Sequence, residues 1–204
     1  LSAIAAQLGA AWRWTEDDTL LIALPLFHVH GLGAGLNGTL AAGAHALLRE
    51  RFDVNDAAAV LRSGAATMFF GVPTMYVRFI ENVPAQRFEH VRLFVSGSAA
   101  LPADIHRAFE EKFGASILER YGSTEFGFPL GNRYEGPRVV GSVGVPMPGV
   151  EVTIVAPKTT TRVAPGEVGE LLVSGPNVCR GYWERPEATA EAFVELDGRR
   201  WFRS

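Results

Sequence analysis

Short apolar runs alternate with helical patterns of apolar residues along the first 120 positions of the chain. The runs lie at residues 20–24, 45–48, 67–70, 93–95 and 115–118. Apolar runs without polar alternation are typical of strands that are buried on both faces of a parallel sheet. Their alternation with helices predicts an α/β fold, in which a mostly parallel sheet with right-handed crossovers carries helices on both faces.

The helices between these runs have recognisable first and last residues. Asp53 begins one helix, with a second acidic residue three positions later, and Gly64 ends it. Pro73 opens the next helix, and Pro102 opens another that ends before Gly114. Because these signals come from local chemistry, they place three helices between successive strands without any knowledge of the tertiary structure.

The first fifty residues raise the question of a membrane span, because residues 19–48 contain no Asp, Glu, Lys or Arg. Pro25, His28 and several glycines argue against a span. We instead expect a helix at residues 1–9, a buried strand, and a Gly-rich helix that packs very close to the sheet and ends at Gly43.

After about residue 136 the composition changes to Gly, Pro and Val, with alternating stretches at 150–155 and 170–173. Alternation with a period of two predicts strands that are buried on one face. We therefore expect an α/β part at residues 1–136 and a small, truncated antiparallel β subdomain at 137–204. Within the latter, residues 186–193 predict a short helix and residues 201–203 begin a last strand.

Composition and charge exclude several classes of protein. The chain has 204 residues and is 48% hydrophobic, which is enough for a sizeable core. A formal net charge of −3 provides no attraction for nucleic acid or an anionic membrane surface. The single cysteine, Cys179, excludes an intrachain disulfide and suits the cytoplasm, or an organelle matrix in a eukaryote. No Met opens the chain, so we expect a piece of a longer protein.

The stretch from residue 119 to residue 127 carries the chemistry around which the other elements are arranged. It follows an apolar strand, and Gly122 and Gly127 bracket Ser123, Thr124 and Glu125. Polar groups beyond the carboxyl end of a strand lie in the crevice where open α/β sheets bind ligands. Thr124 can donate a hydrogen bond to a phosphate oxygen, and Glu125 can hold a hard cation; the alternative is an ordinary solvated loop.

This stretch resembles the Tyr-Gly-x-Thr-Glu signature of the adenylate-forming enzymes, which include acyl-CoA synthetases, luciferases and peptide-synthetase adenylation domains. Three other stretches resemble motifs of that superfamily in the same order: residues 25–31, residues 96–102, and residues 166–171 running on to 181–183. Four motifs in order are far more specific than one. The resemblance implies that the chain is the central part of the N-terminal domain of such an enzyme.

The resemblance also assigns roles to single residues. It implies that Tyr121 stacks on adenine, that Thr124 contacts the α-phosphate and that Glu125 binds Mg²⁺, so that Thr124 and Glu125 are the catalytic residues. The loop at residues 97–100 becomes the adenine wall opposite Tyr121, with an ordinary strand-to-helix turn as the alternative. The nucleotide-binding residues expected in this way are Gly97, Ser98, Ala99, Ala100, Arg120, Tyr121, Gly122, Ser123 and Thr124.

Within the superfamily, residues 71–78 and 96–101 most closely resemble the malonyl-CoA synthetases. This implies that Arg78, helped by Ser98, binds the second carboxylate of malonate or methylmalonate, and that His28 lines the pocket. A solvated helix Arg and a core histidine are the alternatives. Several members carry Met in place of Ser123, so the choice between the two acids stays open. A zinc pair of His28 and His30 lacks further ligands.

The implied reaction joins malonate or methylmalonate to CoA through an acyl-adenylate. ATP, which is released as AMP, and CoA are the co-substrates, and Mg²⁺ is the cofactor. Three alternatives remain: another acyl-CoA synthetase acting on a short-chain, medium-chain or aryl acid, an amino-acid adenylation domain, and a non-catalytic nucleotide-binding module. The family's phosphate loop, ribose-binding Asp and catalytic Lys lie outside these 204 residues, so we expect the isolated piece to be inactive. The oligomeric state stays open.

Overall fold

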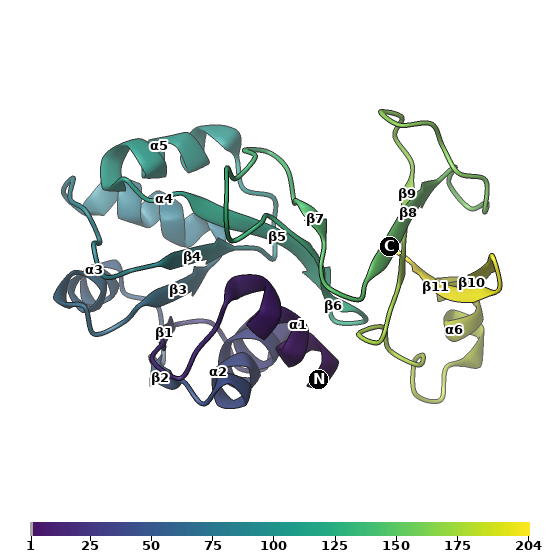
Figure 1. Ribbon diagram of the computed structural model, residues 1–204, viewed down its shortest axis with the longest axis horizontal. Coiled ribbons are helices and arrows are strands. Elements are labelled where there is room, and N and C mark those ends of the chain that lie inside the picture. The colour runs from purple at the N-terminus through teal and green to yellow at the C-terminus, as the bar shows by residue number, and fades with distance from the viewer. Residues whose placement is uncertain (1) are drawn as a thin grey trace.

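A computed structural model describes residues 2–204 and contains two sheets (Figure 1). The larger sheet has seven strands in the order β2-β1-β3-β4-β5-β6-β7. Neighbours among the first five pair in parallel, whereas β6 and β7 are antiparallel to their neighbours. The prediction of a mostly parallel sheet is confirmed. The strands are β1 (Thr19–Ile22), β2 (His45–Leu48), β3 (Met68–Gly71), β4 (Leu93–Ser96), β5 (Ile117–Ser123), β6 (Gly127–Gly131) and β7 (Val145–Pro146).

Helices cover both faces of this sheet, as predicted, because successive residues of each strand point to opposite sides. On β1, Leu20 and Ile22 pack in one apolar cluster with α1, whereas Leu21 packs in another with α3, α4 and α5. Figure 1 shows α4 and α5 on one side of the sheet and α1 and α2 on the other. The helices are α1 (Ser2–Trp12), α2 (Asn37–Ala42), α3 (Val54–Ser63), α4 (Pro73–Asn82) and α5 (Ala103–Phe113).

The predicted helix ends agree with the structure. The carboxylate of Asp53 accepts hydrogen bonds from the backbone N–H groups of Asn55 and Asp56, as an N-cap does. Gly64 and Gly114 both adopt the left-handed conformation just after their helices. The helix expected at residues 1–9 corresponds to α1, with residue 1 outside the described part of the chain.

The Gly-rich segment is a π-helix, η1 (His30–Leu36), that continues into α2. Its close packing against the sheet, expected from the glycines, is present. A Cβ on Gly31 would lie 2.3 Å from the carbonyl oxygen of Pro25, and a Cβ on Gly38 would lie 2.5 Å from the ring of Trp14. Larger residues at these two positions would push the helical segment away from the loop after β1 and from Trp14 of the core.

The strand that carries the Tyr-Gly-Ser-Thr-Glu motif is longer than predicted. The apolar run ends at residue 118, but β5 continues to Ser123 and forms a hairpin with β6. The motif therefore lies on the hairpin and not beyond the end of the strand. Sequence reasoning missed β6 because its Gly-Phe-Pro-Leu-Gly composition is typical of a turn. In the structure all five residues of β6 are buried.

The smaller sheet is antiparallel throughout, which confirms the predicted β subdomain. Its strand order is β10-β11-β9-β8, and α6 (Pro186–Ala192) precedes β10. The sequence did not predict β10, because its Phe-Val-Glu-Leu stretch directly follows the helix. The strands are β8 (Glu151–Val155), β9 (Glu170–Ser174), β10 (Phe193–Leu196) and β11 (Arg199–Arg203).

The two sheets share an apolar core. Val150, Val173 and Phe202 belong to the same cluster as Leu20 and Phe128 of the larger sheet. The larger sheet also includes β7, which lies beyond the change in composition near residue 136, so a domain boundary at residue 136 stays a prediction. Within residues 2–204, every helix is too short or too polar to cross a lipid bilayer.

Candidate functional site

Two cavities meet near the carboxyl ends of the parallel strands, where α/β sheets bind ligands. The first has a volume of about 290 Å³ and is bounded by the loop after β1, the start of α4 and Ser98. The second has a volume of about 240 Å³ and lies between the loop after β4 and strand β5. Ser98 lines both cavities. It has a φ of 69°, a strained conformation for a residue other than glycine.

The second cavity brings together six of the nine residues that the resemblance assigns to the nucleotide. They are Ser98, Ala99, Ala100, Arg120, Tyr121 and Gly122. Gly97, Ser123 and Thr124 are not among the residues that line it. Gly97 has a different geometric reason to be small, because a Cβ there would lie 2.4 Å from the guanidinium carbon of Arg120. Thr124 is exposed on the turn of the hairpin.

Arg120 is a buried cation that lines the second cavity and lies near His30 of the first. Its side chain lies over the ring of Phe128, 4.3 Å from the centroid, and only 3% of the residue is exposed. Among the described residues, nothing accepts a hydrogen bond from its Nε or Nη2 atoms. Burial lowers the pKa of Arg120 to about 9, so the guanidinium is still charged at neutral pH. A buried charge without a partner is costly, and an anionic ligand would supply the missing acceptor.

His30 lies beside Arg120 and was not selected from the sequence as a site residue. Its Nδ1 atom is 3.3 Å from the hydroxyl oxygen of Ser98, and its Nε2 atom has no partner within residues 2–204. Burial, followed by the nearby charge of Arg120, holds the pKa of His30 well below its ordinary value, so the imidazole is neutral. The first cavity therefore has one neutral histidine and one hydroxyl at its inner end.

His28 also lines the first cavity, and its Nδ1 atom accepts a hydrogen bond from the backbone N–H of His30. The resemblance assigns Arg78 to the second carboxylate of the acid, and that role stays a prediction. Arg78 is exposed on α4 and lines neither cavity, although Met75 and Val72, three and six residues earlier, line the first one. Residues three apart on a helix share a face. Arg78 thus lies one turn beyond the wall of the cavity.

Glu119 is a second polar residue that the motifs did not single out. One of its carboxylate oxygens accepts a hydrogen bond from the backbone N–H of Leu101 at 2.9 Å. Burial raises the pKa of this carboxyl group, although the hydrogen bond from Leu101 opposes the rise. Glu119 therefore ties the loop after β4 to β5, which holds the small residues 97–100 opposite Tyr121.

The carboxylate of Glu125 receives a hydrogen bond on each oxygen. The hydroxyl of Ser123 donates to Oε2 at 2.6 Å, and the hydroxyl of Tyr182 donates to Oε1 at 2.9 Å. Partial burial alone would raise the pKa of Glu125, but these hydrogen bonds outweigh it and the pKa is lowered, so the group is ionised at neutral pH.

A single ionised carboxylate suits Mg²⁺, which is commonly held by one or two carboxylates together with phosphate oxygens and water. The described residues contain no group of three or more His, Cys, Asp or Glu side chains that could hold a metal by itself. The donor set around Glu125 therefore fits a cation that arrives with a phosphate ligand, and it does not fit a metal held by protein side chains alone.

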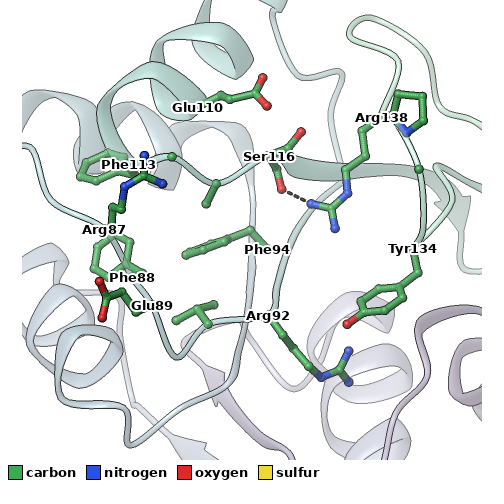
Figure 2. Close-up of a pocket in the computed structure, with 15 residues that line it drawn as sticks. Arg87, Phe88, Glu89, Arg92, Phe94, Glu110, Phe113, Ser116, Tyr134 and Arg138 are labelled. Carbon is green, nitrogen blue, oxygen red and sulfur yellow. Dashed lines mark hydrogen bonds between the residues drawn. The ribbon is translucent and has the colours of Figure 1, made fainter.

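A larger cavity of about 670 Å³ lies at the opposite, amino ends of β4 and β5 (Figure 2). Two of its three arginines already have acceptors: Arg92 forms an ion pair with Asp18 at 2.6 Å, and Arg138 donates a hydrogen bond to the carbonyl oxygen of Ser116. None of the motif residues lines it. The candidate site is therefore the pair of smaller cavities, where the buried charge lacks a partner.

Comparison with known proteins agrees with this geometry. The sequence profile of the family described as AMP-binding enzyme matches residues 1–183. The mitochondrial malonate–CoA ligase of Mus musculus is 38% identical over 100% of this chain and 40% of its own length.

Two solved structures share the fold. ATP-bound MatB from Rhodopseudomonas palustris has a TM-score of 0.94 and 39% identity, covering 100% of this chain and 40% of its own. A malonyl-CoA ligase with methylmalonyl-CoA and AMP bound has a TM-score of 0.89 and 43% identity, covering 100% of this chain and 44% of its own. The chain thus spans about 40% of the length of the curated relatives that it matches. Because the profile covers most of the chain and the matched structures share its fold, the chain belongs to the family of AMP-binding enzymes.

Proposed function

We propose that the parent protein is an ATP-dependent acid–CoA ligase that activates malonate or methylmalonate. A carboxylate oxygen of the acid attacks the α-phosphorus of ATP, the bond to the bridging oxygen breaks, and pyrophosphate leaves. The sulfur of CoA then attacks the acyl carbonyl, the thiol proton is lost, and AMP leaves. The names of the relatives support this substrate class, and the bound ATP, AMP and methylmalonyl-CoA in the matched structures support the two half-reactions.

The observation that carries the choice of a dicarboxylate is the buried, unpaired guanidinium of Arg120. A monocarboxylate uses its only charge at the α-phosphorus and leaves Arg120 without a partner. A dicarboxylate has a second charge, and a planar guanidinium suits bidentate binding of a carboxylate. We therefore add Arg120, which lines the second cavity and lies near His30 of the first, to Arg78, Ser98 and His28 as a ligand of the acid.

The nucleotide roles that we propose follow the second cavity. Tyr121 stacks on the adenine, with the small residues Ala99 and Ala100 on the other side. Thr124 donates its hydroxyl hydrogen to the α-phosphate from the turn of the hairpin. Glu125 holds Mg²⁺, which would offset negative charge as pyrophosphate leaves. Gly97, Gly122 and Ser123 shape the backbone around these groups.

The test is a pyrophosphate-release assay on the full-length parent, with malonate, methylmalonate, acetate, octanoate and 4-coumarate as acids. We expect the largest kcat/KM for one of the two dicarboxylates. Glu125→Ala should lower adenylation by orders of magnitude. Strong turnover with a monocarboxylate only would reject the proposed substrate. Nucleotide binding without any adenylation by the wild-type protein would indicate a non-catalytic module instead.

A short-chain acyl-CoA synthetase is the second candidate, favoured by the apolar side chains of Leu24, Val72 and Met75 in the first cavity. An amino-acid adenylation domain fits less well, because it needs a carboxylate beside the acid for the substrate ammonium. Among the described residues no carboxylate lines the first cavity, and Glu119 lines only the second, where one of its oxygens accepts a hydrogen bond from Leu101. We propose a cytoplasmic or organelle-matrix location; the Mus musculus relative is named mitochondrial.

A further inference from the structure

The turn that carries Glu125 is held by a segment more than fifty residues further along the chain. Residues 177–182, which we call the brace loop, lie between β9 and α6. The side-chain amide of Asn177 donates to the carbonyl oxygen of Phe126 at 2.6 Å, and the backbone N–H of Cys179 donates to the carbonyl oxygen of Glu125 at 2.6 Å. The brace loop therefore holds the two peptide groups that directly follow the Glu125 Cα atom.

The brace loop also fixes the side chain of Glu125. Tyr182 donates its hydroxyl hydrogen to Oε1, whereas the other oxygen is bound by Ser123, only two residues away. Each carboxylate oxygen accepts about two hydrogen bonds or metal contacts. One donor on each oxygen sets the plane of the carboxylate and leaves the remaining lone pairs for a cation.

The brace loop is itself anchored to helix α6. The backbone N–H of Tyr182 donates to the hydroxyl oxygen of Thr189 at 2.9 Å, and the same hydroxyl donates to the carbonyl oxygen of Arg185. A Cβ on Gly181 would lie 2.6 Å from the Thr189 methyl carbon, so the two segments touch. A continuous set of contacts thus runs from α6 through Tyr182 to Glu125.

We infer that Tyr182 is a positioning residue, which holds the carboxylate of Glu125 in the orientation that receives a divalent cation bound to the phosphates of a nucleotide. The inference rests on the proposed function, since it takes Glu125 as the metal ligand. Hydrogen-bonding partners of a metal-binding carboxylate tune both its orientation and its affinity, and losing one commonly costs 10- to 100-fold in metal affinity.

The experiment uses the full-length parent protein, ATP and Mn²⁺, whose free and bound forms are distinguished by electron paramagnetic resonance. No acid is added, so the result does not depend on the choice of malonate. We expect Tyr182→Phe to weaken Mn²⁺ binding in the presence of ATP by roughly 10-fold or more, with metal-free ATP binding little changed. The matched control is Trp183→Phe, since Trp183 is the next residue and is 88% exposed.

The same substitution in a Glu125→Gln variant distinguishes loss of positioning of Glu125 from general damage to the fold. In Glu125→Gln the metal ligand is already impaired, so adding Tyr182→Phe should cause no further loss of Mn²⁺ affinity. Equal losses in both backgrounds would overturn the inference, and so would Tyr182→Phe binding Mn²⁺ as tightly as the wild type. If the wild-type parent itself bound no Mn²⁺ with ATP, the inference and the proposed function would both be rejected.

Discussion

Arg120 carries a buried charge whose Nε and Nη2 atoms have no acceptor within the described residues. Glu125, five residues later on the same hairpin, carries the opposite charge with a hydrogen bond on each oxygen. The two side chains are therefore prepared for different ligands. Arg120 still requires an acceptor, whereas Glu125 is oriented and ionised. This contrast is the reason that we assign the acid to one and the cation to the other.

Arg120→Met tests the role of this single buried charge, because Met has a similar length and no charge. Removing a buried charge that lacks a partner should leave the free energy of unfolding unchanged or raise it by about 1–3 kcal/mol. The same change should lower kcat/KM for malonate by roughly 30-fold or more, since losing one partner of a desolvated charge pair costs about 2–5 kcal/mol. Propionate activation should hold or improve. Urea titration and the pyrophosphate assay measure these two effects.

Arg78→Ala is the matched comparison. Because Arg78 is exposed, its charge contributes at most about 1 kcal/mol, which corresponds to about a 5-fold loss for malonate. A larger selective loss in Arg78→Ala than in Arg120→Met would make Arg78 the principal ligand and reverse our ordering of the two arginines. Equal losses for every acid would show that neither arginine recognises the second carboxylate.

At the scale of the elements, one ion pair ties together segments at the amino ends of the strands. Asp18, just before β1, accepts hydrogen bonds from the Nε and Nη2 atoms of Arg92 at 2.6 Å each. The hydroxyl of Thr67 and the backbone N–H of Thr15 also donate to Asp18. Arg92 in turn donates to the carbonyl oxygen of Trp12 at the end of α1. The pair thus joins α1 to β1 and to the residues that precede β3 and β4.

This pair predicts a defined dependence of stability on pH. Burial would raise the pKa of Asp18, but the hydrogen bonds from Arg92, Thr15 and Thr67 outweigh it, so the pKa in the folded protein is lower than in the unfolded chain. The stabilisation is therefore present above pH 4 and is lost as the pH falls through the folded pKa. Asp18→Asn should cost about 3 kcal/mol at pH 7, because it leaves Arg92 partly buried and unpaired.

Urea titrations of the wild type and Asp18→Asn at several pH values between 7 and 3 measure this effect. The difference in unfolding free energy between the two proteins should shrink as the pH falls below 4. An Arg92→Met, Asp18→Leu double variant is the control, since it removes both charges and should lose less than Asp18→Asn alone. A difference that stays constant across this range would show that the carboxylate charge does not stabilise the fold.

For the molecule as a whole, the two sheets are expected to unfold together. Phe202 of β11 packs edge-on against Phe126 of the site hairpin, with ring centroids 5.4 Å apart, and it belongs to the core cluster of the larger sheet. Phe202→Ala should destabilise the protein by about 3–5 kcal/mol. It should do so in one cooperative transition, seen equally by far-ultraviolet circular dichroism and by tryptophan fluorescence.

Two separate transitions would show that the smaller sheet is an independent unit, as the change in composition near residue 136 suggests. Val168→Ala is the matched control for this measurement, because Val168 is 96% exposed in the smaller sheet's connecting loop. It should leave the free energy of unfolding within about 0.5 kcal/mol of the wild-type value.

The sequence by itself determined the features that depend on neighbouring residues. The apolar runs predicted the five parallel strands, Asp53 and Gly114 predicted helix ends, and the ordered motifs led to the AMP-binding family. Periodicity and capping are local properties, so they are readable without a structure. The motifs also led to the residues of the second cavity, although their chemical roles stay proposals.

Only the tertiary structure decided the contacts between distant segments. In the structure the motif lies on a hairpin that β5 forms with β6, and Arg78 lies outside both cavities. Arg120 is buried, and its Nε and Nη2 atoms have no partner within the described residues. The fold also brings the hydroxyl of Tyr182 to Glu125 across 57 positions of sequence. No periodic pattern encodes such contacts, because they depend on which surfaces meet when the two sheets pack together around one core.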